Sequence, residues 1–301
     1  MHQTIIGGLL AALVVPAVSW TADVQAEEAA GSASAPTRAE LSAATYSGFE
    51  DLNPVTLEDG KWHGEPYVEG GVSAPAVWLD GRFYLAGDLD GDGAEEAVAH
   101  LAQSSGGTGN YGYLVVMGRA GGGLVQKGIS MVGDRVQIRA ARLAGVTIEL
   151  DVLQAGPEDG MCCPSQLATR VFTMGPDGLA ETGSSVIGTL SLETLEGTNW
   201  VLQDDNADTE MPPITLVFDS GKVSGSAGCN RFNGTVTGGI TASNIQVGPL
   251  MTTRMACSGP LMLREQDFLE KLGQSEVFSF MSGDLMLSGA SGRLDFSPAD
   301  D

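Results

Sequence analysis

The chain has 301 residues, of which 15 are lysine or arginine and 38 are aspartate or glutamate, so its formal net charge is −23. This charge excludes a sequence-independent nucleic-acid binder, because such proteins hold phosphates with clustered basic side chains, and it disfavours docking on an anionic membrane surface. Hydrophobic residues make up 43% of the chain, which is enough for a packed core and excludes disorder of the whole chain. The length predicts about two domains.

The N-terminal residues are typical of a secretory leader. Residues 5–18 form an uncharged apolar run, and Val24, Gln25 and Ala26 supply the small-residue pattern of a cleavage site. A bilayer span needs about 20 apolar residues, so this run is too short for an anchor. We expect a signal peptide over 1–26, a flexible tether over 27–43, and a periplasmic or secreted mature protein that keeps no transmembrane span.

Residues 44–174 predict a first β-rich module. Ile148 and Leu150 alternate with Glu149 and Asp151, as in a strand with one solvated face. No stretch of this module has the 3.6-residue period of a long helix, and glycine and aspartate separate the short apolar runs. We expect strands at 83–86, 97–101, 113–117, 135–140, 146–153 and 170–174.

An acidic loop lies between two of these predicted strands. Asp88, Asp90, Asp92 and Glu96 stand at positions 1, 3, 5 and 9 of this loop, with a glycine at position 6. This spacing lets carboxylate oxygens converge on one hard cation, and it resembles the Asp-x-Asp-x-Asp-Gly calcium loops. We therefore predict weak Ca²⁺ binding by this loop.

The alternative to a calcium site is a solvated acidic turn whose aspartates accept hydrogen bonds from the loop's own N–H groups. The loop departs from an EF-hand because Ala99 stands at position 12, where a bidentate glutamate is needed, and because no helix flanks it.

The four cysteines are expected to be disulfide-bonded, since export would place them in an oxidising compartment. We predict a bond between Cys229 and Cys257, which lie in one small β-rich segment. The adjacent Cys162 and Cys163 leave three alternatives: a structural bond, a redox-labile pair, or soft sulfur ligands for Cu(I) together with Met161.

The sequence offers no catalytic constellation. Once residues 1–26 are removed, the histidines are His63 and His100, so the segment from Ser165 onward has no imidazole to serve as a base or metal ligand. We expect that the protein is not an enzyme. A stretch rich in glycine, serine and threonine, 175–191, is expected to link the two modules.

Residues 192–298 predict a second β-rich module with one helix. Ser258, Gly259 and Pro260 form a helix start signal, and Gly273 is a stop signal. The apolar positions Leu261, Phe268, Leu269 and Leu272 lie on one side of that helix together with Glu265. Strands are expected at 214–218, 223–226, 232–236, 245–247, 277–281, 285–288 and 293–296, which gives an antiparallel meander or small barrel.

Two motifs of this module resemble the META domain, the HslJ-like family of bacterial envelope proteins. They are Gly228-Cys229-Asn230 and the Thr-x-Met-x-Cys pattern of Thr253, Met255 and Cys257, and they follow an opening Gly-Thr-Asn-Trp that ends at Trp200. The resemblance implies an association with heat or antibiotic stress, and no catalytic residue is established for the family.

We therefore expect a non-catalytic exported protein of envelope stress tolerance, whose partner is an unidentified protein or envelope component. One alternative is a calcium-dependent binding module. Another is an acidic inhibitor or scavenger of cationic partners such as lysozyme-like enzymes, because removal of Asp23 with the leader leaves 37 acidic against 15 basic residues, a net charge of −22.

Overall fold

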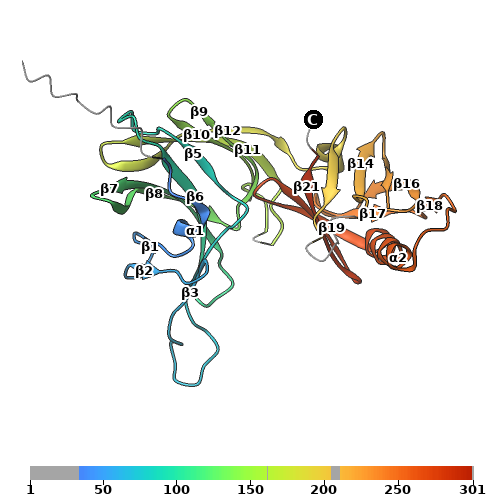
Figure 1. The fold of residues 1–301 in the computed structure, drawn as a ribbon, viewed down its shortest axis with the longest axis horizontal. Coiled ribbons are helices and arrows are strands. Elements are labelled where there is room, and N and C mark those ends of the chain that lie inside the picture. The colour runs from blue at the N-terminus through green and yellow to red at the C-terminus, as the bar shows by residue number, and fades with distance from the viewer. Residues whose placement is uncertain (1–33, 161, 205–210, 300–301) are drawn as a thin grey trace, which may run out of the picture. The chain divides into compact units, whose positions relative to one another are not determined.

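The computed structural model describes residues 34–160, 162–204 and 211–299, and most of them lie in antiparallel β-sheets (Figure 1). This confirms the predicted fold class, which was mainly β. The predicted leader, residues 1–26, lies outside the described residues. Among the helices that the structure describes, none has the length and apolar character that a bilayer span requires.

The predicted tether over 27–43 is wrong for its described part, because residues from Ala35 to Leu41 pack against the first module. Helix α1 (Arg38–Leu41) begins with a capping box in which the N–H of Thr37 donates to Glu40 Oε2 at 2.8 Å. Leu41 is 1% exposed. The capped turn therefore anchors the start of the described chain to a hydrophobic core.

The first sheet has six strands, and its central strands β6 and β7 are buried on both faces. Ala99 and Leu101 face one hydrophobic cluster, whereas Val98, Leu114 and Val116 face another. Burial of both faces explains why these segments are almost continuously apolar in the sequence. The strands in spatial order are β3 (Lys61–His63), β4 (Ala76–Leu79), β6 (Glu96–Ser104), β7 (Tyr111–Ala120) and β8 (Gly123–Asp134), with β5 (Leu85–Gly87) also paired to β6.

Different elements cover the two faces of this sheet. Helix α1 and the small pair β1 (Thr45–Tyr46) and β2 (Val55–Thr56) contribute Leu41 and Tyr46 to the first cluster. A four-stranded antiparallel sheet contributes Ile148 and Phe172 to the second. Its strands are β9 (Gln137–Ala144), β10 (Thr147–Gln154), β11 (Gln166–Gly175) and β12 (Gly178–Thr189).

Strand β12 corrects the expected linker over 175–191. The segment is rich in glycine, serine and threonine, yet it pairs along its length with β11, from Gly178 opposite Gly175 to Thr189 opposite Gln166. Two register shifts in this ladder accommodate the small residues as β-bulges. The chain therefore enters the second module from an edge strand of the first.

The second module is a nearly closed antiparallel sheet. Its strands follow the order β17-β16-β15-β14-β13-β21-β20-β19, and the two ends approach each other, because Asn244 forms a bridge with Val277 and the N–H of Phe278 donates to Ser243 at 2.9 Å. The described strands are β13 (Asn199–Leu202), β14 (Thr215–Asp219), β15 (Lys222–Ser226), β16 (Arg231–Gly238), β17 (Ile245–Val247), β18 (Met251–Thr252), β19 (Ser275–Met281), β20 (Asp284–Gly289) and β21 (Gly292–Pro298), preceded by the turn η1 (Leu192–Leu195).

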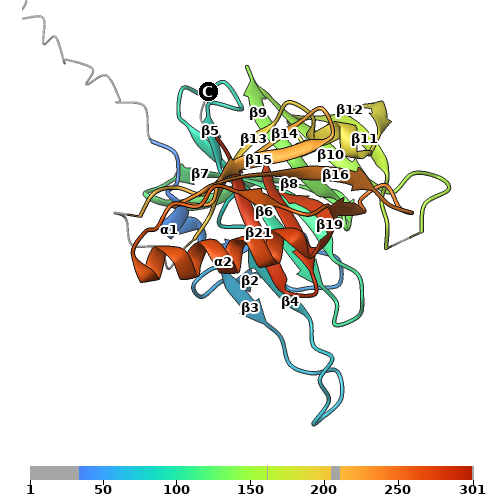
Figure 2. The same ribbon diagram turned by 90° about the vertical axis from the view of Figure 1, so that its right-hand side faces the viewer.

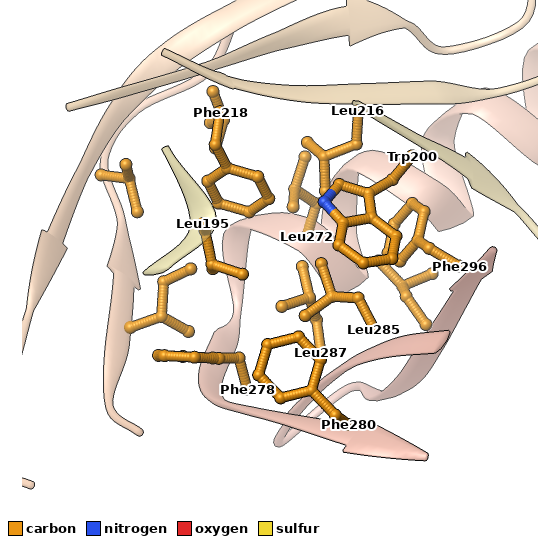
Figure 3. Packing of buried hydrophobic residues seen from close by; sticks show 14 of the residues in the cluster. Leu195, Trp200, Leu216, Phe218, Leu272, Phe278, Phe280, Leu285, Leu287 and Phe296 are labelled. Carbon is orange, nitrogen blue, oxygen red and sulfur yellow. The ribbon is translucent and has the colours of Figure 1, made fainter. Parts of the chain in front are cut away.

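Helix α2 (Gly259–Gly273) is the helix predicted from the start signal, and it lies beside β21 (Figure 2) and β17 (Figure 1). Phe268 is 1% exposed and its ring meets those of Phe232 and Phe296 edge-on. The core around it is aromatic and leucine-rich, with Trp200 among its buried side chains (Figure 3). Phe268 and Leu272 are thus the fully buried apolar side chains with which the helix fills the interior of the sheet.

The tip of hairpin β19–β20 contacts the first module. Ser282 and Gly283 both have positive φ, as a two-residue hairpin turn of this type requires. The N–H of Gly283 donates to the carbonyl of Ile138 at 3.1 Å, and the N–H of Phe280 donates to Gln137 Oε1 at 2.8 Å. The two predicted modules thus belong to one compact unit.

Truncation of the aromatic anchor on α2 tests this packing. Phe268→Ala should lower the free energy of unfolding by about 3–5 kcal/mol, because the rigid sheet around it cannot collapse into the cavity left behind. Gln266→Ala, at an exposed position of the same helix, is the matched control and should change it by less than about 0.5 kcal/mol. Urea denaturation followed by tryptophan fluorescence measures both, and equal losses would contradict the packing described.

Candidate functional site

The Gly-Cys-Asn motif joins a loop to helix α2. Gly228 has φ +97°, a conformation that favours glycine. Asn230 follows with its N–H donating to Glu265 Oε2 at 2.7 Å and its Nδ2 donating to Glu265 Oε1 at 2.9 Å. Both oxygens of a buried carboxylate on α2 are therefore occupied by one asparagine.

The Thr-x-Met-x-Cys pattern completes this arrangement from the other side. Thr253 Oγ1 donates to Asn230 Oδ1 at 2.8 Å, and the N–H of Met255 donates to the same oxygen at 2.7 Å. Asn230 is 3% exposed and Glu265 6% exposed. Because the polar atoms of this buried network are satisfied by one another, the motif residues hold the loop in place.

Both cysteine pairs are bonded in the structure. Cys229 and Cys257 are joined with their Cα atoms 6.1 Å apart, which fastens the same loop covalently. Cys162 is joined to Cys163. Neither sulfur of the adjacent pair is then a thiolate available to Cu(I), and Met161, the third ligand of that alternative, lies outside the described residues.

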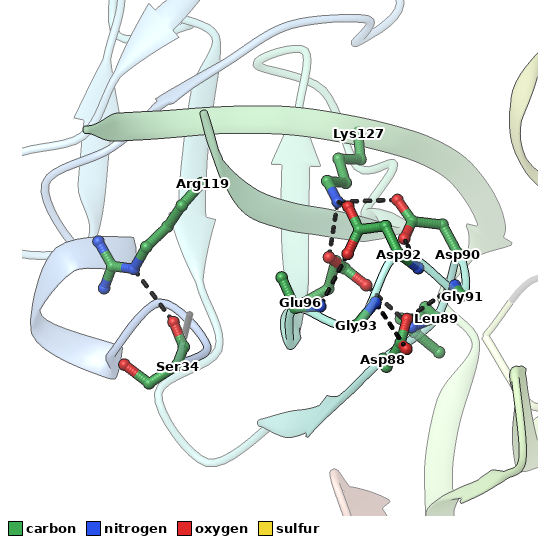
Figure 4. Close-up of polar contacts among 11 residues, drawn as sticks. Ser34, Asp88, Leu89, Asp90, Gly91, Asp92, Gly93, Glu96, Arg119 and Lys127 are labelled. Atoms are coloured by element: carbon green, nitrogen blue, oxygen red, sulfur yellow. Dashed lines mark hydrogen bonds and ion pairs between the residues drawn. The ribbon is translucent and has the colours of Figure 1, made fainter. Parts of the chain in front are cut away.

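The acidic loop folds around its own backbone N–H groups (Figure 4). Asp88 accepts hydrogen bonds from the N–H groups of Gly91 at 2.7 Å and Gly93 at 3.1 Å. Asp92 accepts one from Ala94 at 2.8 Å. These short-range bonds are those of the solvated turn considered as the alternative to a calcium site.

Three of the loop's carboxylates also converge, and they converge on a lysine. Lys127 Nζ lies 2.7 Å from Asp90 Oδ2, 3.0 Å from Asp92 Oδ2 and 2.7 Å from Glu96 Oε1 (Figure 4). Glu96 begins strand β6 and is fully buried, so its charge requires a partner. Its second oxygen accepts the N–H of Leu89 at 2.8 Å, and Lys127 from strand β8 supplies the positive charge.

The pKa shifts of this group agree with the contacts. Partial burial alone would lower the pKa of Lys127, but the contacts with Asp90, Glu96 and Asp92 outweigh it and raise the pKa above its ordinary value. The N–H of Ala94 and the ammonium of Lys127 lower the pKa of Asp92. The stabilisation linked to the lowered pKa of Asp92 is lost only on acidification, and that linked to the raised pKa of Lys127 only at high pH, so these two groups are charged at neutral pH.

Calcium binding by Asp88, Asp90, Asp92 and Glu96 stays a prediction, with Lys127 as a competitor. Oxygens of Asp88, Asp90 and Glu96 lie within 4.8 Å of one another, so the carboxylates fit a common cation. A divalent ion would have to displace the ammonium. Lys127 follows Glu96 by 31 residues, and no local pattern in the sequence connects the two.

Removal of the Cys229–Cys257 bond should destabilise the protein. Opening the loop between these residues should cost about 3 kcal/mol on the loop-entropy estimate, so Cys229→Ser should lower the melting temperature without abolishing the fold. Cys162→Ser is the matched control, because a bond between adjacent residues closes no chain segment and its loss should have a much smaller effect. Alkylation of Cys229 in the native, unreduced protein, seen by peptide mapping, would contradict the bond.

Lys127→Met tests whether the lysine takes the place of a metal ion. With a chelator present, this variant should lose about 3–5 kcal/mol of stability, because Glu96 stays buried without a counter-charge. Calcium at about 1 mM should raise its melting temperature more than that of the wild type, whose gain is bounded at roughly 1.4 kcal/mol for a Kd near 10⁻⁴ M.

Two further variants control this measurement. Adding Asp90→Asn to Lys127→Met should remove the calcium response. Lys222→Met removes a lysine from β15 of the second module and should leave the thermal melts as in the wild type. If Lys127→Met melts identically with Ca²⁺, Mg²⁺ and chelator, the loop is a turn and not a cation site. If the wild type responds as strongly as the variant, Lys127 does not compete.

Comparison with known proteins identifies the second module. Residues 193–301 match the family model of the META domain. An NMR structure of a protein from Burkholderia xenovorans is similar, with 28% identity over 36% of this chain and 86% of that chain and a TM-score of 0.30. A second NMR structure has 25% identity over 36% of this chain and 94% of its own, also at a TM-score of 0.30. No curated protein matches the chain. The C-terminal part of the protein is therefore a META domain, as its two motifs indicated.

Proposed function

We propose that this is a non-catalytic exported protein that supports stress tolerance of the bacterial envelope. The observation that carries the proposal is the META domain over residues 193–301. Its partner is an envelope component or another protein, engaged through binding and not through turnover.

Export is supported by two independent features of the chain. Residues 5–18 and the small residues before position 27 have the composition of a leader. All four cysteines are bonded in pairs, a usage typical of oxidising compartments and rare in the cytosol. Both features favour a periplasmic or secreted location.

The absence of turnover is supported by the geometry around the partly buried His100. Ser282 Oγ donates to Asp80 Oδ2, and His100 Nδ1 lies 3.4 Å from the same oxygen. The carboxylate thus stands between hydroxyl and imidazole, and within the described ranges no hydrogen bond joins Ser282 to His100. A serine nucleophile needs the imidazole next to it, so this group fits a structural contact between the modules.

A deletion strain of the source bacterium tests the proposal. It should be more sensitive than the parent to heat and to antibiotics that act on the envelope, and the full-length gene should restore tolerance. A gene encoding residues 27–301 behind a start codon should not, because its product stays in the cytosol. Mass measurement of the envelope-fraction protein should give residues 27–301 with both disulfides intact. Full rescue by the leaderless gene would contradict a role in the envelope.

A second candidate function, calcium-dependent binding, is favoured by the convergence of Asp88, Asp90 and Glu96. The thermal melts of the Lys127→Met variant decide between the two. A calcium response confined to that variant would assign the loop a structural role and leave the first proposal in place.

A further inference from the structure

A cavity of about 910 Å³ lies where the first module meets hairpin β19–β20. One wall is the face of the six-stranded sheet that carries His100 and Ala102, and the opposite wall includes Phe280 and Met286 of the hairpin. A volume of this size accommodates a small organic ligand, and pockets of drug-sized ligands fall in the same range. The cavity is separate from the acidic loop and from the META motifs.

Small residues in one row of the sheet open this cavity. Lys61 lies opposite Trp78, Trp78 opposite Ala102, and Ala102 opposite Gly112, so the four residues share one face across β3, β4, β6 and β7. Farther along the same face, Val98 and Leu114 are covered by the four-stranded sheet. Where the four-stranded sheet no longer covers this face, Ala102 and Gly112 leave open space. The indole of Trp78 and the ammonium of Lys61 lie in the same row of residues.

Gly112 is required by its neighbour as well. A Cβ atom built on Gly112 would lie 2.9 Å from His100 Nε2, closer than side-chain contacts allow. The absence of a Cβ atom at residue 112 therefore leaves room for the ring of His100 and for the open space beside that ring.

The charge of the cavity wall is opposite to that of the chain. Its lining contains three basic residues, Lys61, Arg82 and Arg135, and one acidic residue, Asp80, whereas the whole chain has 15 basic and 38 acidic residues. Arg135 is paired with Asp134 at 2.8 Å. A lining with more basic than acidic residues is unusual in so acidic a protein, and an anion site there needs a basic residue that no acid already pairs.

Lys61 is the cation of this wall that is left to bind a ligand. Arg82 lies 3.2 Å from Asp284 and 3.6 Å from Asp295, so its charge is compensated by the second module. Lys61 is exposed and has no ion pair among the residues that the structure describes. It stands directly across the strand pair from Trp78, so a ring against the indole would bring an acid group to the ammonium.

We propose that this cavity binds a small organic anion that carries an aromatic ring, with the acid group on Lys61 and the ring against Trp78. The inference is independent of the stress function proposed above, because it concerns a different surface and a small molecule.

A second groove on the protein could also bind an aromatic probe, so the test needs one anionic and one neutral probe. This groove, of about 960 Å³, lies between α2 and the segment 247–252, and it is lined by Met262, Leu263 and Leu269. Its charged lining residues are Glu265 and Glu270, so it repels anions but accepts neutral apolar molecules. Anilinonaphthalene sulfonate, an aromatic anion, should report the cavity, whereas the neutral phenylnaphthylamine, with the same ring system, should report both places.

Fluorescence titration of the full mature chain with both probes tests the proposal. Lys61→Gln should weaken the binding of the sulfonate by roughly three- to tenfold, as expected for a charge-assisted contact, and leave the neutral probe unchanged. Lys222→Gln, which removes an exposed lysine from the second module, is the control and should change neither. Trp78→Leu should weaken the sulfonate as well, with circular dichroism confirming the fold.

Several results would overturn the proposal. The first is a wild type that shows no saturable binding of the sulfonate, and the second is an unchanged affinity for the sulfonate in Lys61→Gln or in Trp78→Leu. The third is a loss of sulfonate affinity in Lys222→Gln as large as that in Lys61→Gln. The fourth is a loss of affinity for the neutral probe in Lys61→Gln as large as that for the sulfonate.

Discussion

Burial of both faces of β6 and β7 is the constraint on which the first module depends. The two strands separate two hydrophobic clusters, and each cluster needs its own cover, one from α1, β1 and β2 and the other from the four-stranded sheet. The same burial reaches Glu96 at the first position of β6, where a carboxylate is fully buried. A buried charge must be paired. The burial of β6 therefore requires the contact between Lys127 of β8 and Glu96, and the acidic loop folds back toward that lysine.

Scarcity of cations shapes the rest of the electrostatics. With 15 basic against 38 acidic residues, most carboxylates face solvent, and several basic side chains lie where an acid is wholly or partly buried. Arg170, 9% exposed, pairs with Glu181, and Arg82 pairs with the buried Asp284. Burial raises the pKa of Asp284, and the nearby Asp80 and Asp295 add to the shift. Among the basic residues that line the cavity, Lys61 is the one without an ion pair in the described structure.

The sequence predicted the second module closely and the first only in part, for a physical reason. Strands such as β16, whose burial alternates residue by residue, have one solvated face, and the period of two is visible without any knowledge of the fold. Strand β8 was missed because Gly128 and Gly133 interrupt its pattern, and β12 was mistaken for a linker because its exposed, small residues pair with β11 through tertiary contacts. The acidic loop was recognised from its spacing, but its lysine comes from a distant strand, and local spacing contains no information about such a partner.

The most specific motifs of the chain are therefore poor guides to where it acts. Gly228 supplies a positive-φ backbone conformation, and Cys229 supplies a covalent bond. Asn230 donates two hydrogen bonds, one to each carboxylate oxygen of Glu265. Residues of this kind hold the local structure of the domain, and that role is independent of the ligand. Binding needs groups with unused capacity, such as an unpaired ammonium beside an indole. In this chain such groups occur at Lys61 and Trp78, outside the META domain, on the face that its hairpin helps to enclose. The META domain thus contributes to that wall through Phe280 and Met286, residues that belong to neither of its recognition motifs.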